Sequence, residues 1–283
     1  MGLINYNIEK YSPKQLVMIP LAMLAVALIL LILNIATTGM PVTPGIDFSG
    51  GTAVTIITTD TREQISLYFA EYPLSEVSDM NNGKFLKFGL MDDAKYKSLT
   101  SLINQRYPDA RIDQIGETFG KSLQSQAVLA LIFSFIGMSI VVFLSFRTFV
   151  PSGAVVLSAF ADIVMTAATM NLIGIQLSLG TLAALLMLIG YSVDSDILLT
   201  NRVLKRQGKL NEKLSGAFRT GIIMTTTTLA AVSAMFLVSW FGAVQIIYEI
   251  SAVLLIGLLF DVMNTWLTNV GILKWYVLKG GGK

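Results

Sequence analysis

The chain has 283 residues, of which 54% are hydrophobic and only 13% are charged, and its mean hydropathy is +0.68. A soluble domain carries about twice that share of charged residues, so the composition predicts a membrane protein. The sequence contains no cysteine and no histidine, which excludes disulfides, thiolate metal sites and proton transfer by histidine. We therefore expect no metal and no cofactor. The net charge of +2 gives no support to nucleic-acid binding.

Six apolar segments are each close to the ~20 residues that a helix needs to cross a bilayer. They are Leu16–Ala36, Ala127–Phe146, Ser152–Leu172, Leu177–Leu199, Gly221–Trp240 and Ile247–Leu273. The first is longer than the apolar part of a typical signal peptide, and no convincing cleavage site of small residues follows it. We interpret it as a membrane anchor rather than a cleaved signal.

The basic residues predict the orientation of these spans. Outside the large first loop, they fall in the two termini, the second-to-third loop and the fourth-to-fifth loop: Lys10, Lys14, Arg147, Arg202, Lys205, Arg206, Lys209, Lys213, Arg219, Lys274, Lys279 and Lys283. All these segments lie on one side of the predicted membrane, and the short loops on the other side carry none. The positive-inside rule therefore places both termini in the cytoplasm and the large first loop outside it.

The predicted organisation has five parts. Residues 1–15 form a cytoplasmic N-terminus, 16–36 the first span, 37–121 an extracytoplasmic domain, 122–275 the other five spans, and 276–283 a cytoplasmic tail.

The large loop has the pattern of a folded domain. Alternating or β-branched runs predict strands at Thr52–Thr59, Glu76–Asp79, Lys84–Leu90 and Ala110–Glu117, and helical patterns lie at Thr61–Tyr72 and Asp92–Tyr107. The sequence Asn81-Asn82-Gly83 predicts a turn. The order β-α-β-β-α-β is typical of a ferredoxin-like fold. The predicted fold class is thus an all-α bundle of six membrane helices with an inserted α+β ferredoxin-like domain.

Four aspartates fall within predicted spans: Asp162, Asp194, Asp196 and Asp261. A charged side chain at the centre of a membrane helix costs about 2.5–3.5 kcal/mol, so each is a candidate functional residue. Asp162 and Asp261 lie near the middle of their helices and are followed by polar residues at helical spacing. Structural or hydrating roles for these two stay open beside functional ones.

Asp194 and Asp196 are about 200° apart around their helix, so both cannot face one groove. We expect Asp194 to join Asp162 and Asp261 in a polar layer inside the bundle. We expect Asp196, nearer the cytoplasmic interface, to be solvated or ion-paired. No glycine-rich phosphate loop, metal cluster or nucleophilic triad is present, and the protein is predicted not to be an enzyme.

Three motifs resemble one known family. The segment Gly45-Ile46-Asp47-Phe48-Ser49-Gly50-Gly51-Thr52 is similar to the G-I-D-F-x-G-G-T signature of the SecD/SecF family, with Gly45, Asp47, Phe48, Gly50, Gly51 and Thr52 as its matching residues. Ile189–Asp196 is similar to the family's I-G-Y-S-V-N-D segment. Ala217-Phe218-Arg219-Thr220, with the threonines that follow, resembles its entry to the fifth helix.

The chain resembles the SecF members of this family. The resemblance implies that it forms one half of a transport unit of the RND superfamily in the plasma membrane. It implies SecD and the SecY translocon as partners, unfolded secreted polypeptides as substrates, and export promoted by a proton or sodium gradient (proton motive force). In that family an intramembrane aspartate and an arginine carry ion coupling. Carried over by motif, these are Asp194 or Asp196, and Arg219.

Two departures bear on the assignment. Bacterial members have N-D where this chain has Asp194-Ser195, and D-R where it has Asn201-Arg202. These differences suggest an archaeal member. The V-D-S-D run is closer to the V-D-A-N pattern of SecD, which favours Asp194 as the coupling residue. Two other functions stay open: an RND-type half-transporter of lipids or small molecules, and a passive subunit that stabilises the translocon.

Overall fold

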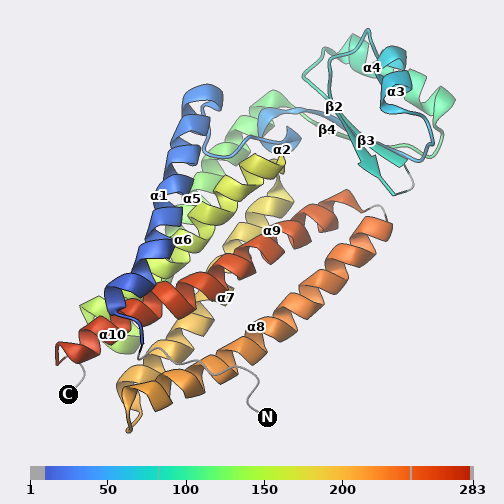
Figure 1. Cartoon of the computed structure of the whole chain (residues 1–283). Helices are drawn as coiled ribbons and strands as arrows, with labels where there is room; N and C mark the ends of the chain where they lie inside the picture. Colours follow the sequence, from blue (N-terminus) through green and yellow to red (C-terminus); the bar gives the residue numbers. More distant parts are fainter. Residues whose placement is uncertain (1–9, 82, 243, 281–283) are drawn as a thin grey trace.

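The computed structural model describes residues 10–81, 83–242 and 244–280, and it contains a helical bundle with a small α/β domain at one end (Figure 1). The five uninterrupted long helices are α1 (Pro13–Thr38), α5 (Glu117–Phe146), α6 (Phe149–Ile173), α7 (Leu179–Lys205) and α8 (Leu210–Phe241). The sixth consists of α9 (Gln245–Met263), a π-helix η1 (Asn264–Asn269) and α10 (Val270–Leu278). Within the described residues, these six helices are long and apolar enough to cross a membrane. The predicted number of spans is confirmed.

The small domain contains a four-stranded sheet. Its elements are β1 (Gly51–Ile56), α3 (Arg62–Tyr68), β2 (Leu74–Met80), β3 (Gly83–Phe88), α4 (Asp93–Arg106) and β4 (Arg111–Ile115). The strand order is β2-β3-β1-β4, and every neighbouring pair is antiparallel. This is the predicted ferredoxin-like arrangement. Asn82 of the predicted turn and Lys283 of the basic tail lie outside the described residues.

Alternation along the strands builds the core of this domain. Val54 and Ile56 are fully buried on one face of β1, where they pack with Ile65 of α3 and Leu99 and Ile103 of α4. Both helices therefore cover the same face of the sheet. Each begins at a capping side chain: the Thr61 side chain accepts a hydrogen bond from the Gln64 backbone, and the Asp92 side chain accepts one from the Lys95 backbone.

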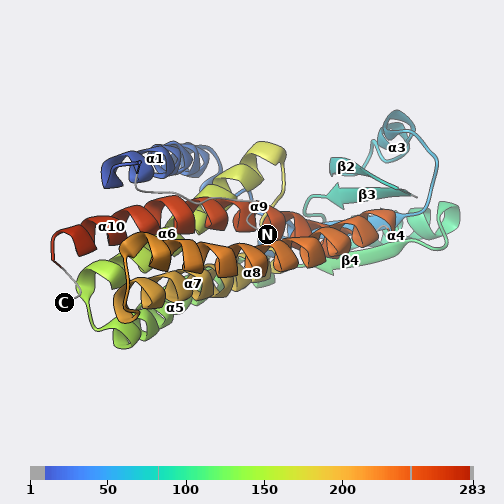
Figure 2. The ribbon, with the colours of Figure 1, turned by 60° about the horizontal axis from the view of Figure 1, so that its bottom comes forward.

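The bundle is organised around α6 and α7. These helices are the most buried of the six, whereas α1, α5 and α8 expose long apolar faces such as those at Ile29, Phe133 and Leu237. Such faces are expected where a protein meets lipid. The α/β domain continues the long axis of the bundle, and the start of α1 and the end of α10 lie at the opposite end (Figure 1, Figure 2). We call the two ends domain-proximal and domain-distal.

Candidate functional site

Three aspartates from three helices are buried in the middle of the bundle. Asp162 of α6 and Asp196 of α7 are 0% exposed, and Asp261 of α9 is 2% exposed. They form what we call the carboxylate cluster. In the described part of the chain, no lysine or arginine forms an ion pair with any of them.

Asp162 accepts two short hydrogen bonds from neighbouring helices. The Ser192 hydroxyl donates to its Oδ2 at 2.6 Å, and Asn264 Nδ2 donates to its Oδ1 at 2.6 Å. The Thr166 hydroxyl, one turn away on α6, donates at 2.6 Å to the backbone carbonyl of Asp162. The carboxylate thus ties α6 to α7 and to η1 at one level.

Asp261 is surrounded by hydroxyl groups. Ser195 of α7 donates to its Oδ1 at 3.2 Å, and Thr265 donates to the same oxygen at 3.2 Å. The two hydroxyls are themselves 3.1 Å apart. Both are buried, so their orientation is fixed by the cluster rather than by solvent.

Asp196 is the least satisfied member of the cluster. Asn269 Nδ2 donates to its Oδ1 at 2.8 Å. Among the described residues, Asp196 Oδ2 and Asn269 Oδ1 are buried without a hydrogen-bond partner. A buried acceptor without a partner costs about 1–3 kcal/mol, so this position is open to a proton, a cation or water.

The π-helix explains how one segment supplies so many polar contacts. Its i→i+5 hydrogen-bonding pattern places residues five apart above one another, and such turns are frequent at functional sites. Asn264 and Asn269 therefore both point inward, to Asp162 and Asp196 respectively. In an uninterrupted α-helix these two side chains would diverge by about 140°.

An unpaired ionised carboxylate is very costly in an apolar interior, and three together repel one another. The cluster is stable only if protons or a cation neutralise part of its charge. Carboxylates and hydroxyls are suitable ligands for either. Uptake of a proton by one of these carboxylates would remove part of the repulsion, so proton exchange is the chemistry that the arrangement favours.

The structure reverses the predicted positions of the two aspartates on α7. Asp196, expected to be solvated or ion-paired, is fully buried, while Asp194 is exposed. Asp194 lies on an outer face of α7 with Met187 and Tyr191, and it does not join Asp162 and Asp261. The reason is the 200° rotation between them: only one can face the interior. Which carboxylate carries coupling stays a prediction.

Arg219 is exposed on α8, and it contacts no member of the carboxylate cluster among the interactions of the described residues. The neighbouring Arg202 of α7 bonds to the Gly216 carbonyl and, at 2.7 Å, to the Thr220 hydroxyl. The basic ends of α7 and α8 are thus joined at the domain-distal end.

The predicted signature segment joins the domain to the bundle. Pro44 pairs with Leu177 in a parallel bridge, and the Gly45 backbone N–H donates to the Leu177 carbonyl at 2.8 Å. Asp47 Oδ2 accepts a 2.7 Å hydrogen bond from the backbone N–H of Leu179, the first residue of α7. Asp47 thereby caps this helix with a negative charge at its positive end.

The glycines of the signature allow close backbone approach. A side chain at Gly45 would come within 2.9 Å of the Leu177 carbonyl, and Gly50 has a positive φ of 78°. Phe48 belongs to the short helix α2 (Ile46–Ser49), which packs on α5, and it is fully buried; Thr52 is 1% exposed. These residues fix the domain–bundle junction.

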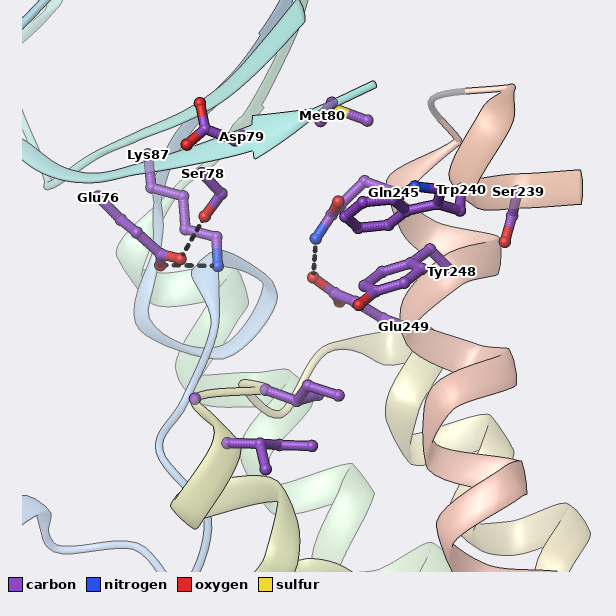
Figure 3. Close-up of a pocket in the computed structure, with 13 residues that line it drawn as sticks. Glu76, Ser78, Asp79, Met80, Lys87, Ser239, Trp240, Gln245, Tyr248 and Glu249 are labelled. Atoms are coloured by element: carbon purple, nitrogen blue, oxygen red, sulfur yellow. Dashed lines mark hydrogen bonds and ion pairs between the residues drawn. The ribbon is translucent and has the colours of Figure 1, made fainter. Parts of the chain in front are cut away.

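A polar cavity of about 230 Å³ lies beside this junction (Figure 3). On the domain side, Lys87 Nζ donates to Glu76 at 3.1 Å and to Gln176 of the α6–α7 loop at 2.9 Å. On the bundle side, Gln245 donates to Glu249 at 2.8 Å. Burial raises the pKa of Glu76, but hydrogen bonds from Ser78 and Lys87 outweigh it and leave the pKa below its ordinary value.

Sequence reasoning missed three residues that donate hydrogen bonds to the carboxylate cluster: Ser192, Ser195 and Asn269. A signal was present for the serines, because Ser192 and Ser195 lie within four residues of Asp196 on the inward side of the helix. Asn269 depends on the π-turn, which hydropathy does not reveal. The threonines at 225–228 belong to α8 and do not reach the cluster; Thr225, for example, bonds to the Gly221 carbonyl at 3.0 Å.

Fold and site together define a multi-pass helical membrane protein with a cluster of buried carboxylates among its helices. Residues 95–279 match the family described as "Protein export membrane protein SecD/SecF, C-terminal". The protein-export membrane protein SecF of Methanolacinia petrolearia is 61% identical over 99% of this chain and 100% of its own length. The chain belongs to the SecD/SecF family of protein-export membrane proteins.

Other relatives agree. The SecF proteins of Haloferax volcanii and Pyrococcus furiosus are 44% and 39% identical, each over 96% of this chain and over 95% and 94% of their own lengths. These relatives are archaeal, as the two departures predicted, and the family is one of transport proteins rather than enzymes.

A solved structure has the same fold. The crystal structure of SecDF, a translocon-associated membrane protein from Thermus thermophilus, matches 94% of this chain with a TM-score of 0.76 and 19% sequence identity. This chain spans 38% of that longer chain. The predicted fold class is confirmed.

Proposed function

We propose that this chain is the SecF subunit of a SecD–SecF pair that assists Sec-dependent protein export, driven by a proton or sodium gradient. The observation that carries the ion-coupling part is the carboxylate cluster: Asp162, Asp196 and Asp261 are buried together without a cationic partner among the described residues. A charge that crosses a potential of about 100 mV releases about 2.3 kcal/mol, enough to bias a two-state motion by well over tenfold.

The exposed face around Asp194 supports a membrane partner. Asp194 lies within a long span and is exposed on the surface of the bundle beside Tyr191. Bare lipid is an unfavourable environment for a carboxylate, so helices of another subunit are expected to cover this face. SecD is the proposed partner, and SecY the translocon with which the pair works. The roles carried over to Asp194 and Arg219 would then operate in the complex.

The proposed location is the plasma membrane, with both termini in the cytoplasm and the α/β domain outside. The lysines and arginines of the chain's loops support this, because Arg147, Arg202 and Lys209 all lie at the domain-distal end of the bundle. Outside the cytoplasm, the domain would meet unfolded secreted polypeptides as they leave the translocon.

The test is export into proteoliposomes that contain SecY, SecD and this chain, under separately imposed proton and sodium gradients. Asp196→Asn keeps the side-chain shape but removes the exchangeable charge, and we expect export to fall to its level without a gradient. Asp109→Asn makes the same change on an exposed loop of the domain and should leave stimulation intact.

Two results would favour the other functions. If the Asn variants of all four intramembrane aspartates, Asp162, Asp194, Asp196 and Asp261, retain full stimulation, a passive assembly subunit is the better description. If the chain does not co-purify with SecD and SecY, a half-transporter of lipids or small molecules becomes the better description.

A further inference from the structure

A groove of about 430 Å³ lies between the first and last helices of the bundle, α1 and α10, at its domain-distal end (Figure 1). The two helices cross at its floor, where Gly271 of α10 packs so closely on α1 that an added Cβ would lie 2.5 Å from Val17. Met18, Leu21 and Ile272 complete its apolar walls. The groove is thus a hydrocarbon-lined space between two helices in tight contact.

The groove has the length of a lipid chain within one leaflet. Its lining runs along α1 from Pro13 to Leu21, eight residues or about 12 Å. The hydrocarbon core of a bilayer is about 30 Å thick, so a chain from one leaflet spans about 15 Å of it. A helix about 10 Å in diameter would need roughly 900 Å³ over the same 12 Å. A hydrocarbon chain therefore fits inside the groove, and a helix does not.

The domain-distal mouth of the groove is basic. Lys14 of α1 lines it, and Lys279, directly after α10, holds its Nζ 4.5 Å from the centre of the Trp275 ring, which also lines the groove. Residues 10–38 and 262–280 contain four lysines and no aspartate or glutamate. In the described part of the chain, neither Lys14 nor Lys279 forms an ion pair. The two helices thus leave this positive charge without a negative partner of their own.

The basic segment between α7 and α8, at the same end, uses its cations differently. Arg202 bonds to the Gly216 carbonyl and the Thr220 hydroxyl, so its guanidinium joins two helices of the chain itself. Among the described residues, Lys14 makes no such bond through its side chain, and it lies at the edge of an apolar groove. Lys14 is therefore placed to bind an anion attached to a hydrocarbon chain.

We propose that the groove between α1 and α10 binds one anionic phospholipid, with a hydrocarbon chain between the helices and the phosphate within reach of Lys14 and Lys279. In the proposed topology the lipid belongs to the cytoplasmic leaflet. Tryptophan is enriched at the level of lipid headgroups, and basic pockets between membrane helices on the cytoplasmic side bind anionic headgroups. Lysine stems lie along apolar surface while their amino groups reach the headgroup. The bound lipid would join the first helix to the helix that contains η1.

Two tryptophans of similar exposure allow a local test. Trp275 lines the groove and is 42% exposed, and Trp240, at the domain-proximal end of α8, is 44% exposed. Trp240→Phe leaves Trp275 as the exposed reporter, and Trp275→Phe leaves Trp240. Trp266 is 4% exposed and is kept in both variants. The full chain is placed in phosphatidylcholine nanodiscs that contain a small fraction of either phosphatidylglycerol or phosphatidylcholine brominated in its acyl chains, and quenching of tryptophan fluorescence is measured.

In Trp240→Phe, we expect brominated phosphatidylglycerol to quench Trp275 at about one-fifth or less of the mole fraction that brominated phosphatidylcholine needs. The reason is that each contacted lysine strengthens the binding of an anionic lipid by about fivefold. Trp275→Phe, which reports on the opposite end, should show no such preference.

Charge variants in the Trp240→Phe background locate the preference. Lys14→Gln combined with Lys279→Gln should abolish it. Lys205→Gln combined with Lys209→Gln removes the same charge from exposed positions at the same end and should leave the preference intact.

Equal quenching of Trp275 by the two lipids, or a preference that survives the loss of Lys14 and Lys279, would overturn the site. Absence of quenching by either lipid would also overturn it, because residues 1–9 or another part of the protein would then fill the groove. If a variant does not fold, native mass spectrometry of the unmodified chain from nanodiscs with equal amounts of both lipids decides. Retention of one phosphatidylglycerol supports the site, and equal retention of the two lipids contradicts it. Neither readout involves export, so the lipid site and the proposed function can fail separately.

Discussion

Gly51 occupies a backbone conformation that side chains rarely adopt. Its φ is 134°, and an added Cβ would lie 2.5 Å from the Phe88 carbonyl across the β1–β3 pair. The residue begins β1 directly after the segment that joins the domain to the bundle. Its lack of a side chain therefore lets the sheet start immediately at the junction.

We expect Gly51→Ala to destabilise the domain by about 1–3 kcal/mol, the usual cost of forcing a residue into such a region. The measurement is the thermal unfolding midpoint of the full chain in detergent. Gly89→Ala is the matched control, because its Cβ would meet Pro73 at an ordinary 3.6 Å and no positive φ is involved. Equal midpoints for the two variants would refute the strain argument.

The two aspartates of α7 show what a residue pattern can and cannot decide. Helical geometry predicted that only one of Asp194 and Asp196 faces inward. The motif comparison favoured Asp194, but the serines at 192 and 195 lie on the Asp196 side and were the better guide.

At the scale of elements, η1 corresponds to one extra residue in the last membrane helix, and it changes which side chains face the carboxylate cluster. It lets Asn264 and Asn269 reach Asp162 and Asp196 while α9 and α10 both pack on α6 and α7. A π-turn corresponds to one residue more than the α-helix needs. Removing one residue there should restore a regular helix without rotating α10.

We predict that deletion of Leu267, within η1, gives a folded, monodisperse protein that lacks gradient-dependent stimulation. Deletion of Leu255, within the regular turns of α9, should rotate everything after it by about 100° and prevent folding. Size-exclusion chromatography of detergent extracts compares the two. If both deletions aggregate, η1 does not have the tolerance expected of a π-turn.

Most elements were predictable because each rests on a local pattern. The six spans follow from long apolar runs, and the strands of the domain follow from alternation around Val54 and Leu86. The π-helix was missed because nothing in the run Asn264–Asn269 distinguishes it from an α-helical polar stripe. Its two asparagines bond to carboxylates contributed by α6 and α7, far away in sequence.

The two ends of the whole molecule differ: the α/β domain lies at one end, and the basic loops lie at the other. We predict that a cysteine at Asp109 labels from outside the cell and one at Lys209 from the cytoplasm. Both positions are exposed, and the native chain has no cysteine to interfere. Impermeant maleimide applied to intact cells and to inverted vesicles makes the comparison. Labelling of both from one side would refute the topology.

One helix bears both the capping contact of the domain and a carboxylate of the cluster. On α7, 17 residues separate Asp196 from Leu179, whose backbone N–H bonds to Asp47. This corresponds to roughly 26 Å along one continuous helix. A helix resists compression along its axis, so a displacement at one end arrives at the other almost undiminished. Any shift of α7 that follows a change of charge at Asp196 must therefore either carry the domain with it or break the bond between Asp47 and Leu179.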